Sequence, residues 1–104
     1  MSDSDPTFNA RVDALIDLCN AQTAKQPTPI LVATSAAFAT ARFAVWATAS
    51  KTLTVAELQE RRQGSIQAYT EGFRQMLEQH YDEMIDNYDR YLNRQPGAVT
   101  RAVD

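Results

Sequence analysis

The chain has 104 residues, which is enough for one hydrophobic core and too few for two, so we expect a single helical domain over residues 1–104. Its 44% hydrophobic and 22% charged residues are typical of a globular protein and exclude a disordered chain. The formal net charge of −3 argues against a cationic surface for phosphate backbones, so we expect no nucleic-acid partner. One cysteine excludes an intramolecular disulfide framework, and the first residues lack a secretory signal pattern. We therefore expect a bacterial-type cytoplasmic protein.

Apolar residues recur at three- and four-residue spacings along most of the chain, which is the periodicity of amphipathic helices. Only three glycines are present, and no Asn-Gly or Asp-Gly hairpin turn occurs. The sequence therefore predicts an all-α fold, a small bundle of three helices. Residues 1–5 and 96–104 are predicted to be loose termini, the latter because Gln95-Pro96-Gly97 is a stop signal.

The first helix is predicted from Pro6 to about Thr23, with Asp5 as its N-cap. Asp13 and Asp17 lie away from its apolar side, so we expect a solvated face there rather than a pair of catalytic carboxylates. The apolar residues share one arc of the helical wheel and form the predicted buried stripe: Phe8, Val12, Leu15, Ile16 and Cys19.

The second helix is predicted from Pro29 to about Ser50, with Thr28 as its N-cap. It is apolar nearly all round, which is typical of a helix buried on several sides. This helix is the one stretch of the chain worth testing as a membrane span. Arg42 lies inside it, and the free-energy cost of inserting an arginine into a bilayer argues against a membrane location. Small residues on one stripe allow close approach of a neighbouring helix, with an oligomer contact as the alternative: Ala33, Ala37, Thr40, Ala44 and Ala47.

The third helix is predicted to begin at Val55, because Thr54 and Glu57 have the spacing of a capping box. If it continues to residue 93 it spans about 60 Å, against about 32 Å for the second helix. Either it breaks at Gly64 or Gly72, or a second copy of the chain covers the excess in a homodimer. Its apolar face holds one phase throughout: Val55, Leu58, Ile66, Tyr69, Phe73, Met76, Leu77, Tyr81, Met84, Tyr88 and Tyr91.

Four polar residues in apolar surroundings form a candidate polar pocket or interface: Arg42, Arg62, His80 and Asn87. Arg62, His80 and Asn87 share the apolar face of the third helix, where a buried polar group must find hydrogen-bond partners. Arg42 is the only charge between Lys25 and Lys51, and it predicts either an ion pair with a neighbouring helix or capture of a carboxylate or phosphate.

Metal and cofactor motifs are missing from the sequence. One cysteine and one histidine do not complete a tetrahedral zinc site, and His80 followed by Glu83 is not the Glu-x-x-His pair of di-metal bundles. No nucleophile elbow, phosphate-binding glycine loop or dinucleotide fingerprint occurs. We therefore expect no metal, no cofactor and no catalytic residue. The five acids from Glu78 to Asp89 are expected to be a solvated face, with a docking strip for a basic partner as the alternative.

Three stretches of the chain resemble a family of small, all-helical, uncharacterised bacterial proteins classed as a domain of unknown function. They are Phe8 to Gln22, Ala41-Arg42-Phe43, and Phe73-Arg74-Gln75-Met76-Leu77 followed by Asp82, Ile85, Asn87, Tyr88, Asp89 and Tyr91. The resemblance covers about residues 8 to 92. It implies that the chain is one stand-alone unit, and it carries no catalytic or binding residue with it.

The functional hypothesis from the sequence is a non-enzymatic helical interaction or scaffold protein that forms a homodimer. In that hypothesis the second helix is central and the long tyrosine-rich helix makes the contact between copies, with a further protein partner as an additional option. The alternative hypothesis is a small-ligand or metal-binding bundle with a pocket near His80 and Arg42. The sequence identifies no particular small molecule.

Overall fold

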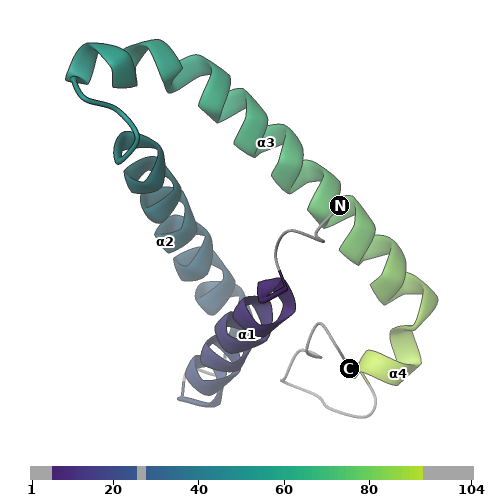
Figure 1. Cartoon of the computed structure of the whole chain (residues 1–104). Coiled ribbons are helices and arrows are strands. Elements are labelled where there is room, and N and C mark those ends of the chain that lie inside the picture. The colour runs from purple at the N-terminus through teal and green to yellow at the C-terminus, as the bar shows by residue number, and fades with distance from the viewer. Residues whose placement is uncertain (1–5, 26–27, 93–104) are drawn as a thin grey trace. The chain divides into compact units, whose positions relative to one another are not determined.

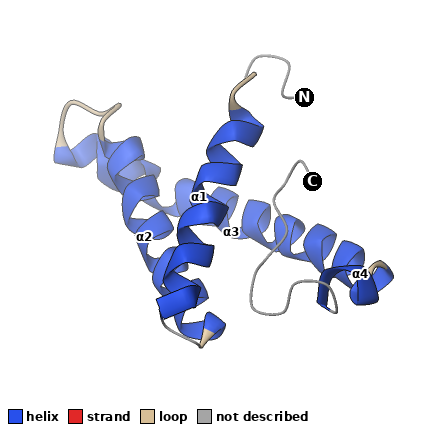
Figure 2. Ribbon diagram, turned by 90° about the horizontal axis from the view of Figure 1, so that it is seen from below, coloured by secondary structure: helices blue, strands red, loops and turns tan. Residues whose placement is uncertain are grey.

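The computed structural model describes residues 6–25 and 28–92 (Figure 1). Four helices make up nearly all of this part: α1 (Phe8–Lys25), α2 (Pro29–Ala49), α3 (Val55–Asp86) and α4 (Tyr88–Leu92). Figure 2 shows helices and loops and no strand within the described ranges. The all-α prediction is confirmed, with four helices in place of three, whereas their assembly into a bundle stays a prediction. The predicted loose termini and the Asp5 cap lie outside the described residues.

The first two helices begin close to their sequence signals. α1 starts at Phe8, two residues later than predicted, and the Thr7 carbonyl accepts the N–H of Arg11 at 3.0 Å. α2 starts at Pro29, as predicted, since proline lacks the N–H that a first helical residue leaves unpaired and has a suitable φ. The Thr28 carbonyl accepts the N–H of Leu31 at 3.0 Å, which places Thr28 at the predicted boundary.

A capping box begins α3, as predicted. The Glu57 N–H donates to Thr54 Oγ1 at 3.2 Å, and Thr54 has the extended backbone of an N-cap, with φ −140° and ψ 159°. Glu57 Oε1 accepts the N–H of Leu53 at 2.8 Å. The return bond of the box therefore goes to the amide before the N-cap rather than to the N-cap itself. The bond to Thr54 Oγ1 satisfies the Glu57 N–H, one of the backbone donors that a helix start leaves unpaired.

α3 is one continuous helix of 32 residues, so of the two alternatives left open by the sequence, the break at Gly64 or Gly72 is wrong. Each glycine costs about 1 kcal/mol relative to alanine, which is too little to interrupt a helix whose extension is cooperative. α3 instead ends at Asp86, before the predicted residue 93. There Asn87 donates its backbone N–H and its side-chain Nδ2 to the Glu83 carbonyl, at 3.1 and 3.0 Å, and leaves helical geometry with φ −124° and ψ 34°.

The chain divides into two compact units. The first contains residues 1–38 and 89–104, so its described part comprises α1, the start of α2 and the end of α4. The second contains residues 39–88, which are the end of α2, the turn at 50–54 and α3. In this turn the N–H groups of Ser50 and Lys51 donate to the Trp46 and Thr48 carbonyls at 2.9 and 3.1 Å. The single domain over 1–104 stays a prediction.

The side of α1 with the least exposure overlaps the predicted buried stripe only in part, because Val12, Ile16 and Cys19 belong to both. Leu15 and Phe8 of the predicted buried stripe are 64% and 50% exposed, whereas Asp13, predicted to be solvated, is only 5% exposed. The less exposed residues are Val12, Asp13, Ile16, Cys19, Asn20 and Thr23. This side is rotated from the apolar arc, because the neighbours that cover a helix decide its orientation and its own hydrophobic pattern is only one term.

α2 was predicted to be buried on several sides, and this is wrong for the described chain. Val32, at 7% exposure, is its only buried residue, whereas Phe38 and Phe43 are 71% and 67% exposed. The physical reason is that an apolar pattern alone does not bury a helix, because burial needs packed elements on several sides.

We expect Thr54→Ala to lower the free energy of unfolding by about 1 kcal/mol, because it leaves the Glu57 N–H without its side-chain acceptor. Chemical denaturation followed by circular dichroism measures this change. Thr54→Ser keeps the acceptor oxygen and is the matched control. Equal losses for the two variants would contradict the capping role.

We expect Gly64→Ala to raise the free energy of unfolding by about 1 kcal/mol, because alanine has the higher helix propensity. A Cβ atom at Gly64 meets nothing within 4 Å, so no clash offsets this gain. The same denaturation experiment measures it. A destabilised variant would show that another chain approaches α3 closely at this position.

Candidate functional site

Exposed apolar surface is the main feature of the described chain. Twenty large hydrophobic side chains are at least 40% exposed, whereas Val32 is the only buried hydrophobic residue within the described ranges. Soluble monomers rarely leave large contiguous apolar patches in water, and such patches mark contacts with proteins, membranes or ligands. The candidate functional site is therefore a surface and not a cleft.

One continuous part of this surface lies along α3. We define the α3 stripe as its apolar face: Val55, Leu58, Ile66, Tyr69, Phe73, Met76, Leu77, Tyr81 and Met84. Tyr69, Phe73 and Met76 at its centre are 52–53% exposed. Within the second unit, the α2 segment 39–49 extends over about 16 Å, whereas α3 extends over about 48 Å. The α2 segment is therefore too short to cover the stripe.

α2 carries a second apolar surface. Its Phe43 and Trp46 rings form a tilted pair with centroids 5.4 Å apart, and Trp46 is 62% exposed. By length and composition, Pro29–Ala49 is the one described helix able to cross a membrane, with a mean hydropathy of 1.5. Only 6% of that window is buried, so its apolar character does not arise from a core position within the described chain.

Two of the four predicted polar residues lie far apart within one copy. Arg62 and His80 are both exposed and lie on the same continuous helix, about 27 Å apart along its axis. They therefore cannot line one pocket in a single chain. Asn87 is half-buried and has a structural role, because it forms the C-cap of α3. The role of these residues at an interface stays a prediction.

Arg42 is exposed on α2, in the second unit. Among the described residues it forms no hydrogen bond and no ion pair, so the predicted link to a neighbouring helix is not seen there. A guanidinium in contact with water needs no partner to remain charged. Capture of a carboxylate or phosphate by Arg42 stays a prediction.

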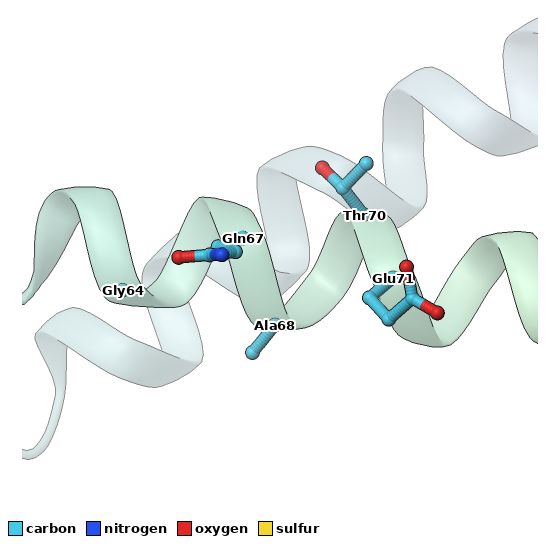
Figure 3. A pocket seen from close by; sticks show the side chains of 5 residues that line it. All are labelled: Gly64, Gln67, Ala68, Thr70 and Glu71. Atoms are coloured by element: carbon cyan, nitrogen blue, oxygen red, sulfur yellow. The ribbon is translucent and has the colours of Figure 1, made fainter.

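Two surface depressions in the described chain are open to solvent. Figure 3 shows one, whose five lining residues all belong to α3: Gly64, Gln67, Ala68, Thr70 and Glu71. The other lies in the first unit, between the end of α1 and the start of α2, near Lys25 and Val32. A depression on one helix cannot surround a small molecule as ligand sites do. No group of three metal-binding side chains occurs in residues 6–25 and 28–92.

An ion-pair network on the charged side of α3 was missed in the sequence. Arg74 Nη2 donates to Glu71 Oε2 at 2.8 Å and Nε donates to Oε1 at 3.3 Å, while Nη1 pairs with Glu78. Gln75 Nε2 also donates to Glu71 Oε2, at 3.2 Å. The missed signal is the spacing of three and four residues between an arginine and two acids. These side chains are exposed, as predicted for this face.

The Arg74 guanidinium lowers the pKa of the Glu71 carboxyl below its ordinary value, and the Gln75 amide adds to the effect. A lowered folded-state pKa stabilises the fold above the unfolded-state pKa, and this contribution is lost as pH falls through the folded-state value. Because the pair is exposed, salt screens it.

We expect Arg74→Gln to raise the pKa of Glu71 towards that of a free glutamate, because its main hydrogen-bond donor is removed. A pH titration of the Glu71 side-chain carbon signal by NMR measures the shift. Arg90→Gln, at a site outside this network, is the control and should leave the pKa of Glu71 unchanged. An unchanged value in Arg74→Gln would contradict the network.

Comparison with known proteins agrees with the resemblance noted in the sequence. The chain matches the family described as "Protein of unknown function (DUF3144)" over residues 8–85. No curated protein and no solved structure matches the chain. The family match starts with α1 and ends within the last turn of α3, so it includes the α2 surface and the whole α3 stripe. The chain therefore belongs to the DUF3144 family of proteins of unknown function.

Proposed function

We propose that this protein is a non-enzymatic helical interaction or scaffold protein that forms a homodimer through the α3 stripe. The observation that carries the proposal is the exposure of that stripe on an unbroken helix. Ile66, Phe73 and Leu77 are 49%, 52% and 45% exposed. Full burial of one such side chain contributes about 1.5–3 kcal/mol, so covering several of them supplies the free energy of a stable association.

A second copy of the chain matches the stripe in length. α3 extends over about 48 Å, whereas α1, with 18 residues, extends over about 27 Å. A second α3 has the same length and the same sequence of apolar side chains. Closed two-fold association is also the commonest arrangement among homo-oligomers. These points favour self-association over coverage by the first unit.

We further propose that the protein acts in the cytoplasm, without a membrane or nucleic-acid partner. α2 is long enough to span a bilayer, but Arg42 lies near its middle, where an arginine costs about 2.5–3.5 kcal/mol on insertion scales. The net charge of −3 disfavours both nucleic acid and anionic lipid surfaces. The exposed apolar residues of α2 remain available to a further protein partner.

We expect the native chain to have twice its monomer mass of 11.6 kDa at micromolar concentration. Phe73→Glu should shift the mass towards that of the monomer, because it places a charge in the middle of the apolar contact. Light scattering coupled to size-exclusion chromatography measures both. Gln67→Glu introduces the same charge on the side of α3 away from the stripe and should leave the mass unchanged.

A mass of 11.6 kDa at all concentrations of the native chain would refute the homodimer. That result would mean that no second copy covers the stripe. A dimer that persists in Phe73→Glu would place the contact elsewhere, with α2 as the next surface to test. Circular dichroism verifies that each variant keeps its helices.

A further inference from the structure

Two polar residues, Arg62 and His80, flank the central apolar residues of the α3 stripe. Arg62 and His80 are eighteen residues apart, which is five full turns at 3.6 residues per turn, so they occupy the same angular position. Five residues of the stripe lie between them. Ile66, Tyr69, Phe73 and Met76 follow one another in steps of three and four residues, and Leu77 lies at the edge of the stripe beside Met76. The continuity of α3 through Gly64 and Gly72 preserves this alignment. The apolar centre of the stripe is therefore flanked by Arg62 on its N-terminal side and by His80 on its C-terminal side.

Charge is distributed unequally between the two ends of α3. The first half carries Glu57, Glu60, Arg61 and Arg62, whereas residues 78–86 carry four acids and no lysine or arginine. On the helical wheel Glu57 and Glu60 lie on the far side of α3, so the charge of the first half that lies on the stripe is that of Arg62. On the helical wheel Glu83 is the acid nearest to the stripe, one turn beyond His80, and the other three lie on the far side. Each copy of α3 thus has a cationic group and an anionic group beside opposite ends of the same apolar centre.

This distribution discriminates between the two ways in which two α3 helices can pair. Parallel pairing places Arg62 beside Arg62 of the second copy and Glu83 beside Glu83, and like charges in contact disfavour association. Antiparallel pairing about the Tyr69–Phe73 centre places Arg62 beside His80 and Glu83 of the second copy. The spacing of Ile66, Tyr69, Phe73 and Met76 is three, four and three residues in both directions, so these four side chains still meet, whereas Leu77 falls opposite Ser65 of the second copy.

We infer that α3 pairs antiparallel with α3 of a second copy, with Tyr69 of each opposite Phe73 of the other and Arg62 beside Glu83 of the other. This inference rests on the proposed homodimer and adds its geometry. Arg62 and His80 are about 27 Å apart within one chain. In the antiparallel dimer Arg62 of one copy lies beside His80 of the other at each end of the interface. Two identical polar contacts then flank one apolar centre.

Charge reversal tests the geometry. In the antiparallel dimer, Arg62→Glu and Glu83→Arg each place two like-charged pairs in contact. Each variant should therefore raise the dissociation constant of the dimer roughly tenfold at low salt. The double variant Arg62→Glu/Glu83→Arg exchanges the charges and should return the constant close to the native value. Analytical ultracentrifugation measures all four proteins. Arg61→Glu, on a neighbouring position outside the stripe, is the matched control.

Cysteine cross-linking tests it without changing a charge. In the antiparallel dimer Ile66 lies opposite Met76 of the second copy. The variant Ile66→Cys/Met76→Cys, made in a Cys19→Ser background to remove the native thiol, should therefore form an intermolecular disulfide. Ile66→Cys alone should not, because the two copies of residue 66 are about 15 Å apart along the helix axis and a disulfide needs Cα atoms within about 7 Å. Non-reducing electrophoresis after mild oxidation shows the products.

The outcomes separate the two proposals. A native chain that stays monomeric overturns both the homodimer and its geometry. A native dimer in which Ile66→Cys alone cross-links overturns only the antiparallel arrangement, in favour of a parallel one. A native dimer with no rescue in the charge-exchange variant and no cross-link in the double cysteine variant places the contact outside α3. Rescue together with the selective cross-link supports the inference.

Discussion

Burial of apolar side chains is the constraint on which this structure depends. Ordering a chain costs conformational entropy at every residue, and apolar burial is the main term that offsets it. The described chain buries one hydrophobic residue, Val32, and leaves its aromatic side chains in contact with water. If the missing burial comes from a second copy, folding and association are one equilibrium. The stability of such a protein depends on its concentration, as in obligate dimers.

Local signals in the sequence predicted most of the fold. The cap at Thr54 and the proline at position 29 set the starts of α3 and α2 through backbone hydrogen bonding, which acts over a few residues and can be read from them. The end of α3 at Asn87 was not predicted, because the apolar pattern continues beyond it to Tyr88 and Tyr91. The orientation of α1 was also missed, since Asp13 is buried by neighbours that its own helical wheel does not contain.

The sequence predicted which residues of the candidate site share one face of the helix. It did not predict whether those residues come together in a pocket. Arg62 and His80 share that face because of their spacing, but whether they converge depends on whether α3 folds back at a glycine. The helix continues, so Arg62 and His80 stay about 27 Å apart along its axis within one copy. The Arg74 network was not predicted for a different reason. Glu78 was treated only as part of a solvated acidic face, although Arg74 has the three- and four-residue spacing of helical ion pairs to Glu71 and Glu78.

Trp46 is the only tryptophan in the chain, and it lies exposed on α2 beside Phe43. Indole fluorescence shifts to shorter wavelength when water around the ring is replaced by apolar atoms. The emission of the unlabelled protein therefore reports on the surroundings of α2, whereas an event confined to α3 leaves it unchanged. The native chain thus contains a spectroscopic probe that distinguishes occupation of one apolar surface from occupation of the other.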